Sequence, residues 1–265
     1  VDLKTFKTVE ILELPNSGGN HSSPFITENS EYIVAGTRFS VPVGDKTDVP
    51  ISTFKENFKG YISFISIAPT NGAMKIAFQL KTPGVSFDLA RAGKGKSHGW
   101  FFFSTYNTEQ AYTLLEVNAS QKDKDFIMAV NWKKAEEYVA QGKAKTFNSS
   151  YFRNYFDEKK HMAFSEEKKT VKVLIPEECP GLIYYLPTPK SPHGVDVDPT
   201  GEYIAAGGKL ASVIVVHSFS KMLKAIENKE FETEIDGIPV LKYESVIAGE
   251  VTNPGLGPLH TEFDG

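Results

Sequence analysis

The residues with the clearest chemical potential are three histidines that stand at a repeated position of the chain. His21 precedes residues 31–36 (EYIVAG) by ten positions, and His193 precedes residues 202–207 (EYIAAG) by nine. Five of the six residues in these two blocks are identical, and His260 begins what reads as a third copy. Neutral imidazole is the commonest metal ligand in proteins. Histidines at one repeated position, without cysteine or carboxylate, suit copper, nickel, iron or zinc.

Other metal-binding and catalytic motifs do not occur in the sequence. It has no HExxH or paired-cysteine zinc motif and no correctly spaced phosphate-binding loop. Residues 93–97 (GKGKS) resemble such a loop only in composition, so we expect a mobile basic loop there. The competing interpretation of the repeated histidines is that each one satisfies a hydrogen bond in a loop. His98, His161 and His217 lie outside the repeat, and we expect them to be structural or exposed to solvent.

The elements that must position these histidines are mostly short strands separated by turns. Gly, Pro, Asn and Asp punctuate apolar segments of strand length, as in a protein built from many strands. The expected strands are residues 31–36, 60–67, 74–80, 100–105, 126–132, 170–175, 203–207 and 211–217. Residues 133–141 and 218–228 have helical composition or spacing instead, and each segment directly follows an apolar strand.

Composition is that of a globular chain and excludes some functions. The 265 residues carry 29 Lys and Arg against 33 Asp and Glu, and this formal net charge of −4 argues against nucleic-acid binding. No apolar stretch approaches the ~20 residues needed to cross a bilayer, so we expect no membrane span. Cys179 is the single cysteine and therefore cannot form an internal disulfide.

The internal repeat predicts a β-propeller. Val130 and Val216 end matching strands 86 residues apart, which is about two units of the ~40–45 residues typical of a propeller blade. Equivalent positions of successive blades surround one central channel, so the repeated histidines are expected to converge there. A partial propeller would have an open edge that is prone to pair with another chain. We therefore also expect self-association.

Three blocks of the sequence resemble nitrous-oxide reductase. They are residues 191–196 (SPHGVD) with 208–210 (GKL), residues 102–109 (FFSTYNTE), and residues 255–265 (GLGPLHTEFDG). The blocks follow the order found in that family, and the resemblance extends from about residue 18 to residue 265.

The resemblance implies an all-β fold in which residues 1–265 form part of an N-terminal, seven-bladed catalytic β-propeller with short helical insertions. In that family, a sulfide-bridged four-copper cluster at the propeller centre is held by seven histidines. His21, His193 and His260 match three of these ligands. An adjacent histidine pair is expected before this chain and two further ligands after it. The C-terminal cupredoxin domain, with its dinuclear copper site, is expected to be absent from the chain.

The resemblance also implies a calcium site near the cluster. Tyr106, Glu109 and Asp123 match its side-chain ligands, and oxygen donors of this kind suit a hard cation. Val117 would bind through its backbone carbonyl, and Ser191 stands where the family has Asn.

The implied activity is the reduction of nitrous oxide to dinitrogen and water in denitrification, with no catalytic residue beyond the metal ligands. The implied setting is a periplasmic homodimer that receives electrons from a donor such as a cytochrome c or a cupredoxin. This chain alone is expected to be inactive. Two alternatives remain open. One is a non-catalytic β-propeller that binds or scaffolds a protein partner, and the other is a propeller enzyme that uses another metal.

Overall fold

The computed structural model describes residues 2–8, 10, 12, 14–17, 25–38, 40–42, 49–107, 125–148 and 170–264. Three sheets and a few short helices make up this part of the chain, which confirms the all-β class. Within it, no helix has both the length and the apolar character required to cross a membrane.

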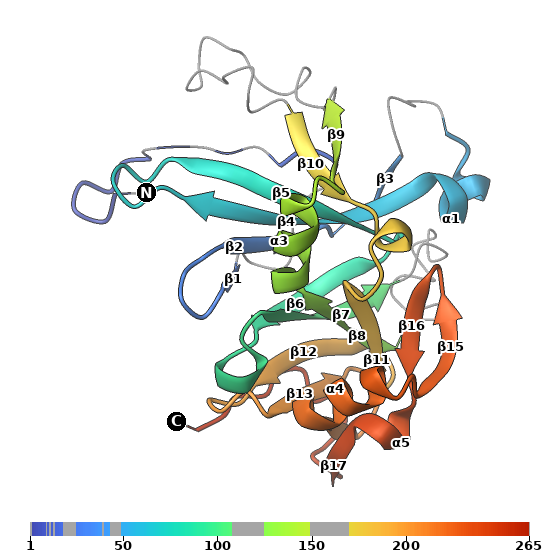
Figure 1. Cartoon of the computed structure of the whole chain (residues 1–265). Coiled ribbons are helices and arrows are strands. Elements are labelled where there is room, and N and C mark those ends of the chain that lie inside the picture. The colour runs from blue at the N-terminus through green and yellow to red at the C-terminus, as the bar shows by residue number, and fades with distance from the viewer. Residues whose placement is uncertain are drawn as a thin grey trace.

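Each sheet is built around four antiparallel strands in chain order (Figure 1). In the first sheet these are β1 (Phe25–Ile26), β2 (Ile33–Gly36), β4 (Phe58–Ile67) and β5 (Met74–Thr82). In the second they are β6 (Ser86–Ala92), β7 (Trp100–Asn107), β8 (Phe126–Asn131) and β11 (Ile183–Pro187). In the third they are β12 (Pro192–Val197), β13 (Tyr203–Gly208), β14 (Val213–Ser218) and β17 (Ile247–Thr252). The first strands of the three sheets are neighbours, because β6 contacts both β1 and β12.

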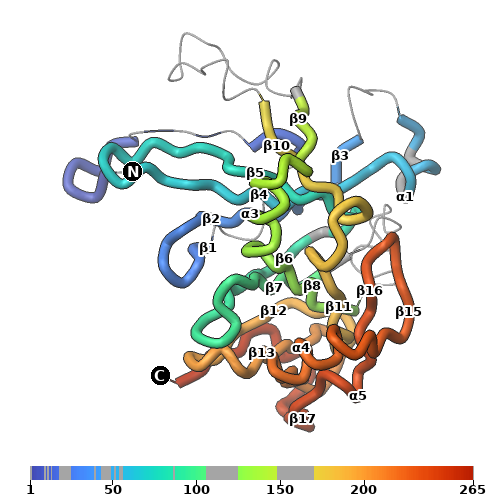
Figure 2. The backbone as a smooth tube through the Cα atoms, in the orientation of Figure 1, coloured from blue at the N-terminus to red at the C-terminus, as the bar shows by residue number. Residues whose placement is uncertain are grey.

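Two excursions of the chain join neighbouring sheets at their far edges. Between β8 and β11, the chain forms β9 (Lys145–Asn148) and β10 (Thr170–Leu174), and β10 pairs in parallel with β5 of the first sheet. Between β14 and β17, it forms β15 (Phe231–Ile235) and β16 (Ile238–Leu241), and β16 pairs in parallel with β11 of the second sheet. Figure 2 follows the backbone through both excursions. The second and third sheets are therefore each interrupted by an antiparallel pair of strands that joins the preceding sheet.

The same order of elements corrects the predicted repeat length. Val130 in β8 and Val216 in β14 both lie in the third strand of their sheets, and these two sheets follow one another in the chain. The spacing of 86 residues is therefore one structural unit and not two. The estimate was wrong because the excursions lengthen each unit. Among the described residues, the three sheets do not form a closed ring.

Short helices follow the third strands, as the sequence predicted. In α3 (Trp132–Ala140), the Asn131 side chain accepts a hydrogen bond from the Lys134 N–H. In α4 (Phe219–Glu227), the Ser218 hydroxyl accepts one from the Lys221 N–H. These side chains satisfy N–H groups that the first turn of a helix leaves unpaired. The remaining helical turns are α1 (Phe54–Asn57), α5 (Tyr243–Val246), η1 (Ile51–Thr53), η2 (Gly95–Ser97) and η5 (Pro176–Glu178).

The second sheet is buried on both faces, which explains the aromatic run at the start of β7. Phe101 and Phe103 belong to the apolar cluster shared with the first sheet, whereas Phe102 belongs to the cluster shared with the third. Successive side chains of a strand point to opposite faces, so a sheet with core on both sides needs a continuous apolar run. The second sheet therefore packs between the first and third sheets and holds all three together.

A short strand, β3, and the outer edge of β17 complete the fold. The two-residue strand β3 (Val41–Pro42) pairs with β4. Within the described ranges, β17 pairs with β14 on one side and with no strand on the other. Self-association through such an edge stays a prediction.

Candidate functional site

Two of the repeated histidines lie side by side in the structure. His193 is in β12, and His260 is in the segment that follows β17. Their ring centroids are 4.9 Å apart, and the ring planes are tilted by 54°. The His193 side chain is largely buried, whereas His260 is exposed. His21 lies outside the described residues.

A buried carboxylate contacts one ring nitrogen of His193. Asp88 in β6 places Oδ2 2.7 Å from His193 Nδ1, and only 5% of the Asp88 side chain is exposed. The contact has the length of an ion pair, although its angle is not that of a hydrogen bond. A carboxylate at one imidazole nitrogen makes the ring a better metal ligand through the other nitrogen. His193 therefore has Nε2 available for a ligand.

The hydroxyl of Ser104 holds the strands that carry Asp88 and His193 together. Ser104, in β7, donates to the His193 carbonyl at 2.6 Å and accepts a hydrogen bond from the Leu89 N–H at 3.0 Å. The Ser104 side chain is wholly buried. One buried hydroxyl thus connects β6, β7 and β12 where the carboxylate and the imidazole meet.

Positive side chains lie near the two histidine-bearing segments, and one of them interacts with Asp88. Burial lowers the pKa of Lys209 to about 8, although the nearby Asp88 carboxylate partly opposes this shift and the Arg38 guanidinium adds a smaller lowering effect. Arg91 contacts Asp196 of β12 at 3.1 Å and Glu262 of the C-terminal segment at 3.1 Å. The first strands and the segment that carries His260 are therefore joined by charge as well as by packing.

Comparison with known proteins agrees with the sequence motifs. The nitrous-oxide reductases of Cupriavidus necator and Ralstonia nicotianae are each 25% identical to this chain, over 267 and 274 residues. The enzyme of Pseudomonas fluorescens is 24% identical over 266 residues. The chain is similar to nitrous-oxide reductase along its whole length. It spans 36–37% of the length of these curated relatives.

Comparison with family models and with solved structures gives no further assignment. No family model matches the chain. A hydrazine synthase of Kuenenia stuttgartiensis has a TM-score of 0.49 and 13% identity, over 89% of this chain and 50% of that one. A putative 6-phosphogluconolactonase of Bacteroides uniformis has a TM-score of 0.39 and 10% identity, over 94% of this chain and 49% of that one. At these scores, neither structure carries an argument about this chain.

The residues that match nitrous-oxide reductase ligands fit a copper site in part. Two imidazoles at 4.9 Å, one of them backed by a carboxylate, are close enough to bind one metal ion or two neighbouring ions. Among the described residues, however, no group of three or more His, Cys, Asp or Glu is arranged to hold a metal. The donor set is therefore incomplete in this part of the chain.

The proposed calcium ligands cannot be assembled from the described residues. Glu109, Val117 and Asp123 lie outside them, and only the backbone of Tyr106 is described, in β7. Ser191 is buried, and its N–H donates to Asp125 Oδ1 at 3.0 Å. A calcium site is thus not supported by these residues.

Two histidines outside the repeat have structural surroundings, as expected, and His161 lies outside the described residues. His98 places Nδ1 3.2 Å from Glu28 and Nε2 3.0 Å from Glu31, so it holds the turn between β1 and β2 against η2. His217, in β14, is wholly buried, and burial lowers its pKa to about 4.

The glycine- and lysine-rich segment 93–97 is better fixed than the sequence suggested. Lys94 Nζ donates to the Val197 carbonyl at 3.0 Å, and Lys96 Nζ lies 3.2 Å from Glu202. Both ammonium groups are therefore engaged in contacts with the third sheet. The prediction of a mobile basic loop was wrong because composition does not reveal these long-range partners.

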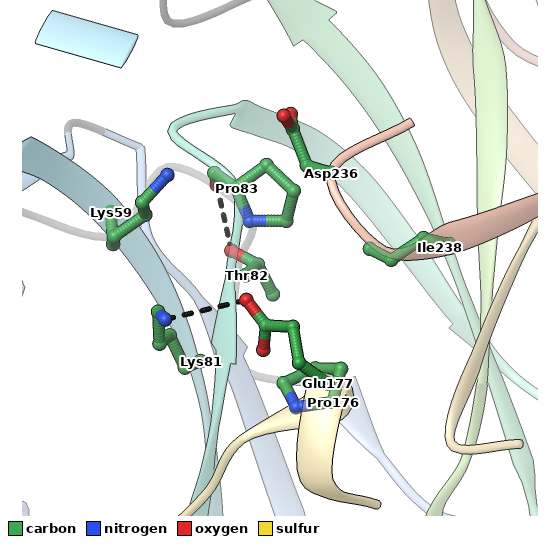
Figure 3. Close-up of a pocket in the computed structure, with 8 residues that line it drawn as sticks. All are labelled: Lys59, Lys81, Thr82, Pro83, Pro176, Glu177, Asp236 and Ile238. Carbon is green, nitrogen blue, oxygen red and sulfur yellow. Dashed lines mark hydrogen bonds and ion pairs between the residues drawn. The ribbon is translucent and has the colours of Figure 1, made fainter. Parts of the chain in front are cut away.

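The pocket in Figure 3 is separate from the histidine pair. It lies among β4, β5, η5 and the turn between β15 and β16, and Lys81 and Glu177 approach to 3.5 Å across it. Its volume of about 10 Å³ is room for about one water molecule. A neighbouring hollow of about 390 Å³ is lined in part by Cys179. Neither hollow is lined by a histidine of the repeat.

Sequence reasoning missed the residues that support the histidine pair. Asp88, Ser104 and Arg91 come from β6 and β7, far from either histidine in the chain. The available signal was charge in an otherwise apolar strand: β6 reads SFDLARA, and Asp88 is buried there. A buried charge in a strand indicates a partner elsewhere in the fold, because charged side chains are rarely buried unless they are paired.

Proposed function

We propose that this chain supplies part of the copper-sulfide centre of a nitrous-oxide reductase. The observation that carries the proposal is that two histidines of its family-like motifs, distant in the sequence, meet in space at 4.9 Å. Similarity to nitrous-oxide reductases along the whole chain supports the same assignment. His193, His260 and, outside the described residues, His21 are the proposed ligands.

The proposed reaction is the reduction of nitrous oxide, with two electrons and two protons, to dinitrogen and water in denitrification. A bound copper-sulfide cluster would supply several electron-rich metal ions to an inert substrate. His193 and His260 would bind copper as neutral imidazoles, which add no negative charge to the site. Asp88, whose Oδ2 lies 2.7 Å from His193 Nδ1, would favour a proton on that nitrogen electrostatically and so leave Nε2 for the metal.

The charge around Asp88 suggests how the site is balanced. Lys209 has a pKa of about 8, so this side chain carries a proton at neutral pH, and it lies in the electrostatic range of Asp88. Its ammonium group would offset the charge of the buried carboxylate.

We propose that the three sheets are consecutive blades of a seven-bladed β-propeller. The repeated four-strand order and the contacts of β6 with β1 and β12 support that arrangement. Residues 1–265 would then be part of the N-terminal domain, with a dinuclear copper site on a separate cupredoxin domain. The complete protein would be a periplasmic homodimer that takes electrons from a cytochrome c or a cupredoxin. Tyr106, Glu109, Val117, Asp123 and Ser191 remain a proposed calcium site.

Metal binding by the chain as it stands tests the assignment. Titration with Cu(I) against a chromophoric competitor should show binding that is lost in His193→Ala and His260→Ala. His98→Ala, which alters a histidine outside the pair, should bind copper as the unaltered chain does. The chain by itself should show no nitrous-oxide reduction with a viologen donor. Binding of zinc or iron but not copper would favour another metalloenzyme, and no metal binding would favour a scaffold.

A further inference from the structure

The segment that carries His260 lies in unusually close contact with two glycines of the third sheet. A methyl group placed on Gly194 of β12 would lie 2.2 Å from the Leu259 carbonyl oxygen and 3.1 Å from the His260 Cα. One placed on Gly207 of β13 would lie 2.2 Å from the Pro258 carbonyl oxygen. Carbon and oxygen atoms normally approach no closer than ~3.3 Å. The backbone of residues 258–260 therefore occupies space that only glycine leaves free.

Close approach, and not backbone conformation, is the reason for glycine at these two positions. Neither Gly194 nor Gly207 has a positive φ, so an alanine could adopt either backbone conformation without strain. A glycine inside a strand often marks a place where another backbone comes near. Here that other backbone belongs to the His260 segment.

We propose that Gly194 and Gly207 are positioning residues that set the distance between the His193 and His260 imidazoles. Gly194 directly follows His193 in β12. The same short stretch of strand therefore carries one proposed ligand and packs against the backbone that carries the other, His260. This inference deepens the proposed copper site and rests on it.

The other contacts of the segment hold it less strictly. Arg91 contacts Glu262 at 3.1 Å, but 78% of the Glu262 side chain is exposed. An exposed ion pair contributes little to stability. The Gly257 N–H donates to the Ala211 carbonyl at 3.4 Å, near the upper limit for a hydrogen bond. The glycine contacts are therefore the ones that fix how closely the segment approaches β12.

The size of the clash predicts the size of the effect. In Gly194→Ala the Leu259 carbonyl must retreat by about 1 Å to reach an ordinary contact distance. His260 is the next residue and moves with it. Metal-ligand distances tolerate only ~0.2 Å of variation, so a displacement of this size removes His260 from a shared site.

Gly249 provides a matched control in the same sheet. It lies in β17, its φ is not positive, and a methyl group placed there has no atom within 4 Å. Gly249→Ala therefore adds the same methyl group to the same sheet without displacing the segment.

Two measurements on the whole chain test the inference. Hydrogen exchange of the metal-free protein reports docking of residues 257–262, and Cu(I) competition reports the histidine pair. In Gly194→Ala and Gly207→Ala, we expect exchange in this segment to accelerate and Cu(I) affinity to fall by about tenfold or more. Gly249→Ala should change neither.

The two measurements separate the inference from the proposed function. If the unaltered chain binds no Cu(I) but Gly194→Ala still accelerates exchange in residues 257–262, the copper site is wrong and the positioning role stands. Unchanged exchange and unchanged affinity in both variants would overturn the positioning role. Loss of protection in β4 and β7 of both variants would overturn it too, because the glycines would then serve general packing.

Discussion

Acidification should destabilise this protein through His217. The side chain is wholly buried in β14, and within the described part of the chain neither ring nitrogen makes a hydrogen bond of normal geometry. Burial lowers its pKa from 6.5 to about 4, and the nearby Pro187 carbonyl opposes the shift only partly. The folded protein therefore resists a proton that the unfolded chain accepts readily. The stabilising contribution of neutral His217 is complete above pH 6.5 and is lost as the pH falls towards 4.

The two pKa values set the magnitude. Proton linkage between pKa 6.5 in the unfolded chain and about 4 in the folded one predicts a loss of about 2 kcal/mol between pH 7 and pH 5. The loss rises to roughly 3 kcal/mol at pH 4. Buried carboxylates with lowered pKa values, such as Asp198, act only below about pH 4, so the interval from pH 7 to 5 isolates histidine.

Urea unfolding at pH 7, 6 and 5 measures this contribution when the chain is compared with His217→Phe. The variant keeps a ring of similar size but cannot be protonated, and the other histidines contribute equally to both proteins. We expect the free energy of unfolding to fall with pH by about 2 kcal/mol more in the unaltered chain than in the variant. Parallel pH profiles would refute the reasoning, because they would mean that His217 is protonated or hydrated in the folded state.

Three further substitutions test other parts of the structure. Asp88→Asn should lower Cu(I) affinity about tenfold in competition titrations, and unchanged affinity would show that the carboxylate does not support its imidazole partner. Hydrogen bonds from two serine hydroxyls hold the pKa of Glu202 at about 2, so Glu202→Gln should lower the free energy of urea unfolding at pH 7 by about 1 kcal/mol. That difference should shrink as the pH falls below 4.5, and a constant difference would contradict the charge-based explanation. Phe102→Ala should destabilise the chain by about 3–5 kcal/mol in thermal unfolding, whereas Phe6→Ala, at a side chain that is 83% exposed, should have little effect.

Strands with long apolar stretches were predicted well. β4, β5, β7 and β8 have long apolar stretches, and their observed bounds lie within two residues of the predicted ones. The first strands of the second and third sheets, β6 and β12, were missed. They contain Asp88, His193 and Gly194, residue types that are rare in strands. Strand propensity fails there because these residues are explained by the contact of Asp88 with His193 and by the close approach of another backbone to Gly194.

The histidine pair was predictable and its support was not. A repeat in the sequence indicates equivalent positions, so His193 and His260 could be expected to approach one another. Asp88 belongs to a different sheet, and no local pattern connects it with either histidine. The correct unit length was also hidden, because the excursions through β9–β10 and β15–β16 lengthen the repeat without leaving a periodic signal.

The pairing of β10 with β5 and of β16 with β11 has a consequence during synthesis on the ribosome. The outer edge of β5 is completed by β10, which emerges only after residues 83–169 have been made. In the same way, the edge of β11 stays unpaired until β16 has been made. A growing chain would therefore expose unpaired strand edges, which are prone to pair with other chains. The first and second sheets are completed only when part of the next sheet has been made, so a pause in translation before that point leaves the nascent protein most vulnerable to aggregation.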